Sequence, residues 1–403
     1  MSRLEELIQQ YCPDGVEYRP IWSLTAWDKK FNGIDKSKQK KVIKYNYLLA
    51  ADLKSYQVEG GTVKLLTTNI SNLYTTEELA EDLASDGEVV AIPWGGNPIV
   101  QYYKGRFLTA DNRIATSLDT TLLNNKFLYY CMLSKMDIIA SFYRGSGIKH
   151  PEMAKVLDLE IPVPPLPVQE EIVRILDTLT ELQAELQAEL QAELQKRLQQ
   201  YNYYRDKLLS FNDLNGEGYA VSVEWKKLGE LGVNLDRKRK PIAAGKREAG
   251  DIPYYGASGI VDYVKGYLFD GDYLLVSEDG ANLLTRTYPI AFSIHGKTWV
   301  NNHAHIIEFK ERATRKYVEY YLNSIDLSPW ISAGAQPKLT QDNLNRITIP
   351  IPPLAEQQRI VDILDRFDKL TTDISAGLPA EIEARRKQYE YYRDLLLTFK
   401  QKA

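Results

Sequence analysis

The chain has 403 residues, of which 44% are hydrophobic and 26% charged, and its formal net charge is −4 at pH 7. This length allows two or three domains with cores of their own, and no apolar run approaches the roughly 18 residues of a membrane-spanning helix. Cys12 and Cys131 lie too far apart in the sequence to indicate a disulfide framework or a metal cluster. Because the amino-terminal residues also lack a signal peptide, we expect a cytoplasmic protein.

The first expected elements are an amphipathic helix over Leu4–Tyr11 and a globular part over roughly 16–160. Three segments between residues 88 and 118 are rich in β-branched and aromatic residues and are separated by glycine and proline turns, a pattern typical of strands. A helix is expected at 127–134. A Gly-rich turn and a short helix then precede a proline-rich corner that begins at Ile161.

A long helix is predicted from about Val168 to Phe211, and at 1.5 Å per residue it would be about 65 Å long. Its segment LQAELQAELQAELQKRL places leucines four residues apart from Leu182 to Leu198. Such a stripe winds slowly around the helix, so it needs a partner helix that crosses or wraps it. An ordinary coiled-coil spacer is the simplest interpretation of this repeat.

The chain then repeats itself. IPVPPLPVQEEIVRILD begins at Ile161 and IPIPPLAEQQRIVDILD at Ile349, while QYNYYRDKLLSF ends at Phe211 and QYEYYRDLLLTF ends at Phe399, at the same offset. The second helix should kink near Gly377-Leu378-Pro379 and pack antiparallel to the first. The predicted fold class is therefore α/β (α+β): two duplicated mixed α/β domains separated by a pair of long antiparallel coiled-coil helices, with pseudo-two-fold symmetry.

The sequence offers no convincing catalytic constellation. His303 and His305 would share a face if NNHAH is a strand, but without further ligands nearby a polar or phosphate contact is favoured over a metal site. Gly95-Gly96 indicates a turn and not a phosphate loop. Asp111-Asn112 lacks the aromatic neighbours of an amino-methyltransferase motif and the second carboxylate of a nuclease. We therefore predict a non-catalytic protein without a metal site.

Positive charge is concentrated in two stretches at matching points of the repeat. Seven lysines lie between Lys29 and Lys44 against one acid, and six basic residues lie between Arg237 and Arg247 with none. One such cluster alone would be a solvated loop, but two in equivalent places suggest contacts with DNA phosphates.

Reading of bases requires polar side chains in loops, where a role as a turn or capping residue is the competing interpretation of each. The candidate DNA-binding residues of the first part are Lys29, Lys30, Lys38, Lys40, Lys41, Lys44, Asn97, Asn112, Arg113, Lys149 and His150. Those of the second part are Arg237, Lys238, Arg239, Lys240, Asn301, Asn302, His303, Gln336 and Lys338.

The paired segments IP-x-PPL, Q-x-x-IV-x-ILD and QY-x-YYRD-x-LL-x-F, each following a variable α/β module, resemble the specificity subunit of type I restriction–modification enzymes. The resemblance covers essentially the whole chain. It implies the domains 16–165 and 212–353 as target-recognition domains, 166–211 and 354–403 as conserved long helices, and 1–15 as an amino-terminal helix. Each recognition domain would read one half of a bipartite, asymmetric DNA sequence, and the helices would set the spacer.

The resemblance also implies partners. Two modification subunits would complete an adenine-N6 methyltransferase that uses S-adenosylmethionine, and restriction subunits would add ATP- and Mg-dependent translocation and cleavage, so no cofactor would bind to this chain. The candidate subunit-docking residues are aromatic or arginine residues of the two helices, which are favoured in interfaces: Tyr201, Tyr203, Tyr204, Arg205, Tyr389, Tyr391, Tyr392 and Arg393. Two alternatives stay open: the tyrosines could seal each helix against its domain, and the chain could be a coiled-coil scaffold whose modules bind protein.

Overall fold

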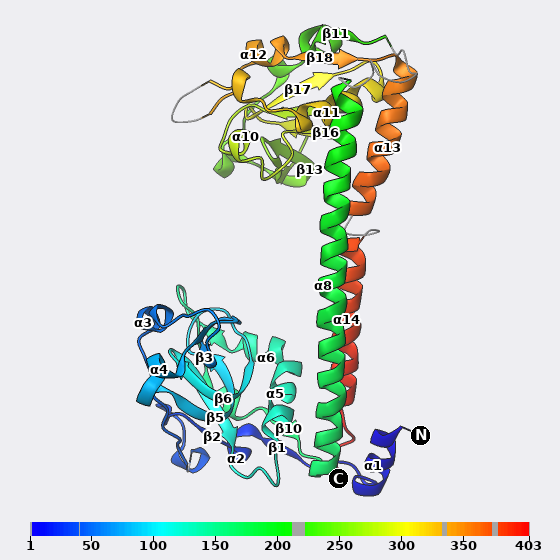
Figure 1. The fold of residues 1–403 in the computed structure, drawn as a ribbon. Helices are drawn as coiled ribbons and strands as arrows, with labels where there is room; N and C mark the ends of the chain where they lie inside the picture. Colours follow the sequence, from blue (N-terminus) through cyan, green and yellow to red (C-terminus); the bar gives the residue numbers. More distant parts are fainter. Residues whose placement is uncertain (1, 40, 212–221, 333–336, 373–377, 403) are drawn as a thin grey trace. The chain divides into compact units, whose positions relative to one another are not determined.

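The computed structural model describes residues 2–39, 41–211, 222–332, 337–372 and 378–402. They form two compact units (Figure 1). Unit 1 comprises Met1–Ala188 and Ile382–Ala403, and unit 2 comprises Glu189–Glu381. Each unit thus contains one α/β domain together with the beginning of one long helix and the end of the other.

Unit 1 is built on a six-stranded sheet in the order β2-β7-β5-β6-β3-β4, in which only β3 and β6 are parallel neighbours. The strands that sequence patterns predicted between residues 88 and 118 are confirmed, and α5 confirms the helix expected at 127–134. One face of the sheet packs on α5, where Val90 and Ile92 meet Phe127 and Leu128. The strands are β2 (Thr25–Trp27), β3 (Val63–Leu66), β4 (Tyr74–Thr75), β5 (Ser85–Pro93), β6 (Gln101–Thr109) and β7 (Asn112–Ser117), and the helices beside them are α5 (Asn125–Ser134) and α6 (Met136–Ser141).

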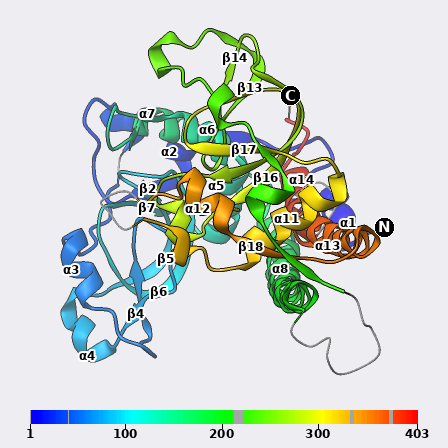
Figure 2. The ribbon, with the colours of Figure 1, turned by 90° about the horizontal axis from the view of Figure 1, so that it is seen from above.

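Unit 2 contains a sheet in the order β12-β17-β15-β16-β13-β14, which matches that of unit 1 strand for strand, with β13 and β16 as the parallel pair. Even local detail is repeated. Gly87 faces Gly105 across β5 and β6, Gly271 faces Gly296 across β15 and β16, and Gly105 and Gly296 both have a positive φ. The predicted duplication of the domain is confirmed. Its elements are β12 (Val233–Asn234), β13 (Ala249–Gly256), β14 (Gly259–Val264), β15 (Phe269–Ser277), β16 (Ala291–Val300), β17 (Ala304–Glu308) and α11 (Arg312–Ser324), and β13 and β14 form a hairpin (Figure 2).

A smaller two-stranded sheet leads into each long helix, where β1 pairs with β10 and β11 pairs with β18. The repeated P-x₄-Q of the corner has a structural reason. Nε2 of Gln169 donates to the carbonyl of Pro164 (2.6 Å), and Nε2 of Gln357 donates to the carbonyl of Pro352 (2.7 Å). Each buried glutamine therefore supplies a donor to a backbone carbonyl of its proline corner. The strands are β1 (Tyr18–Pro20), β10 (Glu160–Pro162), β11 (Glu224–Lys227) and β18 (Thr348–Ile351).

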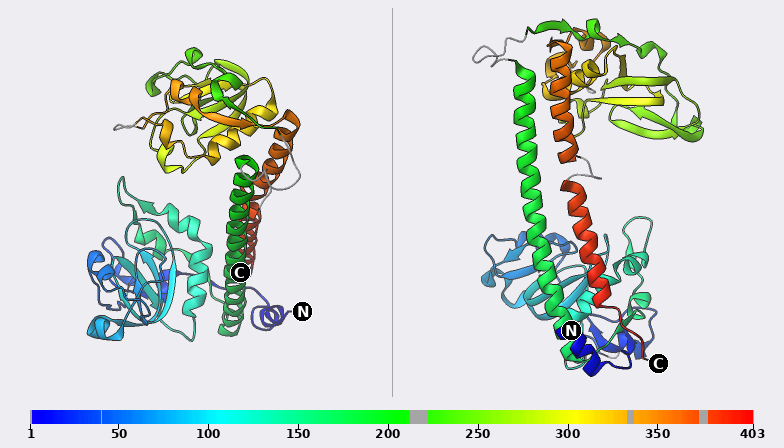
Figure 3. Two further views of the ribbon diagram at one scale, coloured as in Figure 1. Left: turned by 45° about the horizontal axis from the view of Figure 1, so that its top comes forward. Right: turned by 90° about the vertical axis from the view of Figure 1, so that its right-hand side faces the viewer.

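The long helices are α8 (Leu166–Ser210), α13 (Leu354–Thr372) and α14 (Leu378–Leu396). The continuous helix predicted from Val168 is confirmed. Residues 373–377, which include Gly377 of the predicted kink, lie outside the described residues. In unit 1, α14 runs antiparallel to α8, and in unit 2, α13 does the same (Figure 3). The hydroxyls of Thr180 and Tyr389 are 2.9 Å apart in unit 1, and Tyr204 stacks on Phe367 in unit 2.

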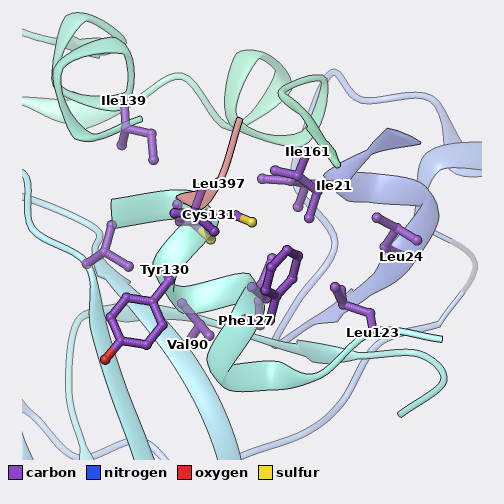
Figure 4. Packing of buried hydrophobic residues seen from close by; sticks show 14 of the residues in the cluster. Ile21, Leu24, Val90, Leu123, Phe127, Tyr130, Cys131, Ile139, Ile161 and Leu397 are labelled. Atoms are coloured by element: carbon purple, nitrogen blue, oxygen red, sulfur yellow. The ribbon is translucent and has the colours of Figure 1, made fainter. Parts of the chain in front are cut away.

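The end of each long helix belongs to the core of the domain that lies beside it. In unit 1, Leu397 packs close to Cys131 and other residues of the domain core (Figure 4), and in unit 2 Leu209 occupies the equivalent place in the cluster around Ile360 and Leu364. The amide of Val16 also donates to the carbonyl of Lys400 (2.8 Å). The segment around Val16 and the segment around Lys400 are therefore joined in unit 1, and α14 with the residues that follow it completes the first domain.

Short elements complete the two units. The predicted amino-terminal helix is confirmed as α1, and the short helices predicted before the proline corners are confirmed as α7 and α12. These and the remaining elements are α1 (Arg3–Tyr11), α2 (Ile21–Leu24), α3 (Ala50–Ser55), α4 (Glu77–Ala80), β8 (Tyr143–Arg144), β9 (His150–Pro151), α7 (Met153–Leu157), α9 (Leu228–Leu231), α10 (Asn282–Thr285) and α12 (Gln341–Arg346).

Candidate nucleic-acid interface

Three segments meet at one end of each six-stranded sheet, and we call them together the loop edge. In unit 1 the loop edge consists of 94–97, 111–113 and 149–150; in unit 2 it consists of 278–281, 303–305 and 337–338. The amide of Gly96 donates to the carbonyl of Lys149 (3.1 Å), and that of Gly280 donates to Pro337 (3.2 Å). Both glycines have φ near +100° (100° and 102°), so the same turn occurs in both units.

A buried aspartate supports each loop edge from below. Oδ1 of Asp28 accepts from the amide of Ile114 (3.0 Å), and Oδ1 of Asp236 accepts from the amide of Ile306 (2.9 Å). The aspartates follow the first strand of their sheets, β2 and β12, and hold the strands β7 and β17. The second carboxylate oxygen has different partners in the two units. Oδ2 of Asp28 accepts from the hydroxyl of Tyr47 (2.8 Å) and lies 3.8 Å from Arg113, whereas Oδ2 of Asp236 lies 2.5 Å from Nδ1 of His305. The two edges thus share a frame and differ in charge.

In unit 1 the loop edge is aromatic and basic. The guanidinium of Arg113 lies 4.1 Å from the centre of the Trp94 ring, and Nδ1 of His150 donates to the carbonyl of Trp94 (2.7 Å). A pocket of about 500 Å³ opens beside them, and Lys29 and Lys30 contribute to its wall. Burial raises the pKa of the Asp28 carboxyl.

In unit 2 an ion network fills the equivalent place. Nη1 of Arg239 donates to Oε2 of Glu278 (2.7 Å) and its Nη2 lies 3.4 Å from Asp236, while Nζ of Lys338 lies 3.1 Å from Oε1 of Glu278. Both ring nitrogens of His305 face acceptors, the carboxylate of Asp236 and the carbonyl of Leu339 (2.7 Å). The network therefore contains two carboxylates and three cationic or proton-donating groups.

Asp236, Glu278 and His305 lie close enough together to hold a metal ion, which would make this buried group a candidate metal site. Their ligand atoms, however, are already paired with Arg239 and Lys338 and with a backbone carbonyl. Burial opposes ionisation of both carboxyls, but the pairing with His305, Arg239 and Lys338 outweighs it, and the pKa of each carboxyl is lowered. The geometry fits an ion network better than a cation site.

Most of the predicted DNA-binding residues are exposed, and several of them gather at the loop edges. Lys38 instead pairs with Asp158 (2.6 Å), and Lys40 and Gln336 lie outside the described residues. His303 precedes β17, so it does not share a strand face with the buried His305. The exposed candidates are Lys29, Lys30, Lys41, Lys44, Asn97, Lys149, His150, Arg237, Lys238, Lys240, Asn302, His303 and Lys338.

Four predicted residues are buried or nearly so, and they support the edge without presenting their side chains to a ligand. Nδ2 of Asn112 donates to the carbonyl of Leu66 (2.8 Å), and Oδ1 of Asn301 accepts from the amide of His303 (2.8 Å). Arg113 and Arg239 are held in the contacts described above. Asn112, Arg113 and Asn301, which were predicted to read bases, and Arg239, which was predicted to contact phosphates, thus expose little of their side chains.

Sequence patterns missed the residues that give each loop edge its character. Trp94 and Glu278 take equivalent places, since the amide of Trp94 donates to the carbonyl of Asp111 (2.7 Å) and that of Glu278 to His303 (2.9 Å). Asp279 follows and pairs with His303 (2.9 Å). The sequence does contain one indication of their importance: Trp94 and Glu278 each follow the last residue of a strand and stand two residues before the turn glycine, Gly96 or Gly280.

The predicted docking residues divide between the two interpretations. Tyr203 and Tyr204 are 61% and 46% exposed, and Tyr391 and Tyr392 are 64% and 45% exposed, with the two rings of each pair in edge contact. The other four pack inward: Tyr201 contacts the core of unit 2, Tyr389 bonds to Thr180, and Arg205 and Arg393 pair with the following aspartates.

Comparisons with known proteins decide the family. Residues 32–196 and 221–384 match the type I restriction modification DNA specificity domain. The chain belongs to this family. It carries two copies of the domain and is a DNA sequence-recognition subunit, so the protein-binding scaffold is not favoured. Members of this family are specificity subunits and not themselves catalysts.

Two relatives and one solved structure are similar to this specificity subunit. The Escherichia coli EcoR124I/EcoR124II specificity subunit is 34% identical over 71% of this chain and 74% of its own length. A Haemophilus influenzae protein named as a type I specificity subunit is 40% identical over 43% of this chain, and the match spans only 46% of that protein. A structure from work on assembly and conformational transition of a type I restriction–modification system shares the fold, with a TM-score of 0.59 at 15% identity over 96% of this chain and 98% of that one.

Across the ranges that the structure describes, no helix combines the length and the apolar character needed to cross a bilayer.

The ion network of unit 2 makes its stability depend on pH. The pKa of Asp236 is lowered in the folded state, so its stabilising contribution is present above the ordinary aspartate pKa of about 3.9 and is lost as the pH falls through the lower folded value. Asp236→Asn should cost about 3 kcal/mol at neutral pH and flatten the acid dependence below about pH 4. Urea unfolding at a series of pH values measures both effects. The exposed Asp251→Asn is the control, and equal losses in the two variants would contradict the role of the network.

Proposed function

We propose that each domain reads one half of a bipartite, asymmetric DNA sequence through its loop edge. The observation that carries this proposal is the pairing of an identical sheet order with different side chains at the same place: Trp94 and His150 in unit 1, and Glu278 and Lys338 in unit 2. Recognition of two different half-sites requires the same backbone fold in both domains with different side chains at the recognition surface. Base edges are told apart by hydrogen-bond donors and acceptors, which is what differs between the two edges.

The exposed lysines and arginines beside each loop edge supply the contacts with phosphates. Lys29 and Lys30 line the pocket of unit 1, next to Arg113, and Arg237 and Lys238 follow β12 in the equivalent stretch of unit 2. These cations lie in a chain of net charge −4, so the positive field is local to the loop edges. Such contacts give affinity and orientation without sequence preference.

Exchange of Lys29 and Lys30 for glutamine should weaken binding to the recognised duplex and to unrelated DNA alike. Each lost phosphate contact reduces the magnitude of the negative slope of log K against log salt by about 0.9, so the magnitude should fall by about two in the double variant. Titrations of the assembled complex between low and physiological salt measure it. Lys38→Gln is the matched control, because Asp158 already compensates the charge of Lys38. An unchanged slope in the double variant would place the phosphates elsewhere.

The long helices set the unread spacer between the half-sites. α8 is one uninterrupted helix of 45 residues that begins in unit 1 and ends in unit 2. A change in its length therefore changes the separation of the domains that it connects, as far as α13 and α14 permit.

Deletion of Leu186–Glu189, one LQAE repeat, shortens α8 by about 6 Å and turns its end by about 40°. At about 3.4 Å per base pair, the recognised spacer should change by one or two base pairs while both half-sites stay the same. Sequencing of methylated bases in cells that carry the variant and its methyltransferase measures the spacer. A deletion variant that methylates the parental spacer would falsify the role of the helices, and a parent that produces no bipartite methylated motif would refute the proposed function itself.

The partners follow from the same function. We propose that two modification subunits bind this chain and supply adenine-N6 methylation with S-adenosylmethionine, and that restriction subunits add ATP- and Mg-dependent translocation and cleavage in the cytoplasm. The exposed tyrosine pairs on α8 and α14 suit a docking surface for the modification subunits, because aromatic side chains bury large areas at little cost in entropy. Each long helix offers one such pair at the same point of the repeat.

Replacement of Tyr203 and Tyr391 by alanine should weaken association with the modification subunits by about 2 kcal/mol for each anchor. The fold should remain intact, since both side chains are more than half exposed. Titration of modification subunits onto the variant chain measures the loss. The exposed Gln191→Ala on α8 serves as the control. Full assembly by the double tyrosine variant would show that these pairs are not the docking surface.

A further inference from the structure

The loop edge of unit 2 pairs two half-exposed side chains, Lys338 and His303, with carboxylates. Nζ of Lys338 lies 3.1 Å from Oε1 of Glu278, and Nδ1 of His303 lies 2.9 Å from Oδ1 of Asp279. The donors are half exposed, at 48% and 49% of their side-chain surface, whereas the carboxylates are only 11% and 15% exposed. The edge thus presents donors at the surface with acceptors directly beneath them.

This pairing is unfavourable for a phosphate contact. A carboxylate within 3 to 4 Å of the ammonium cancels much of its charge and repels an approaching phosphodiester. The lysines beside the edge of unit 1 differ, since the ammonium of Lys29 lies over the neutral ring of Tyr47. Donors that are paired with carboxylates therefore suit neutral acceptors, and at a DNA surface the neutral acceptors are base edges.

The lysine is also held in one direction. Glu278 is fixed by Arg239, which donates to its other carboxylate oxygen (2.7 Å), and its backbone amide and carbonyl bond to His303 and Leu339. The pKa of Glu278 is lowered because these cations outweigh the effect of burial, so the carboxylate stays ionised at neutral pH. A fixed carboxylate orders Lys338 before DNA binds, which reduces the entropy lost on contact.

We propose that the Lys338–Glu278 and His303–Asp279 pairs of unit 2 read a G·C base pair in the major groove. The proposal rests on the proposed function and names the base pair that this loop edge recognises. Lys338 can donate to both major-groove acceptors of guanine, N7 and O6, and the cytosine amino group beside them donates to a carboxylate. An A·T pair presents an adenine amino donor where guanine has O6, and it would face the Lys338 ammonium.

Unit 1 provides an internal comparison. The equivalent places hold Trp94 for Glu278, Gly95 for Asp279 and His150 for Lys338, so neither carboxylate is present. The ring of His150 packs on Trp94 and bonds to its carbonyl. The G·C preference is accordingly assigned to the half-site of unit 2 alone.

The test uses the full chain assembled with its modification subunits and the duplex that sequencing of methylated bases identifies. Each guanine of the recognised sequence is replaced in turn by 7-deazaguanine, which lacks the N7 acceptor, and the dissociation constant is measured. In the parent complex one position should weaken binding by about tenfold. In Lys338→Met the same replacement should matter by less than about twofold, because the donor is already gone. Lys338→Arg, which keeps a donor, should restore the sensitivity.

Lys297→Met is the matched control. Lys297 is exposed in the same unit and lies over the ring of Tyr267, away from the carboxylate pairs, so this variant should keep the parental sensitivity. Three results would overturn the inference: no guanine position coupled to Lys338, a half-site of unit 2 without a G·C pair, or a loss in Lys338→Met that is equal for all sequences and lowers the salt slope, which marks a phosphate contact. Absence of any bipartite motif would instead overturn the proposed function, and this inference with it.

Discussion

The burial of each helix end in the domain beside it is the contact on which the rest of the structure depends. Leu209 and Leu397 are 2% and 6% exposed, in cores that the Gln-bonded proline corners and the first turns of α8 and α13 also enter. Truncating a leucine so buried typically costs about 2–5 kcal/mol. The core of the first domain includes Leu397, after α14, and the core of the second includes Leu209 of α8, so each domain depends on a segment from the far end of a long helix. A substitution at either helix end therefore alters the packing of the domain core that contains it.

The second constraint is the buried aspartate under each loop edge. Asp28 and Asp236 follow the edge strands β2 and β12 and accept the amides of Ile114 and Ile306 in the neighbouring strands β7 and β17, which fixes the backbone there. The second carboxylate oxygen has different partners in the two units, Tyr47 and Arg113 in one and His305 in the other, and this difference leaves room for variation. Arg113 with Trp94 is one solution, and His305 with Arg239 is another. The frame can thus stay constant while the surface above it changes, which is what recognition of different sequences requires.

The repeat motifs were informative because their contacts are local or lie at fixed points of the fold. The proline corners, the helix span from Val168 and the duplicated sheets all followed from residues that pack in the same way twice. The loop edge was less accessible. Asn112 was a candidate for contacts with bases, but its side-chain amide donates to the carbonyl of Leu66, a residue of a strand that no sequence pattern had indicated. Trp94 and Glu278 share a place only through strand pairing, so their correspondence emerges in three dimensions and not along the chain.

Specific recognition of DNA requires the contacts with bases to be separated from the attraction to phosphates. A lysine that is free to swing binds any sequence, and its contribution falls steeply with salt. A lysine held by a carboxylate loses much of that general attraction, and its remaining favourable contacts are with neutral acceptors in the right position. The wrong base then leaves both the lysine and the carboxylate facing unsuitable groups, so that the pair penalises mismatches more than it rewards binding. If the pairs read bases as proposed, the ion network of unit 2 would weaken general affinity for DNA and increase selectivity, and the exposed lysines and arginines beside the edge would restore the affinity without affecting the selection.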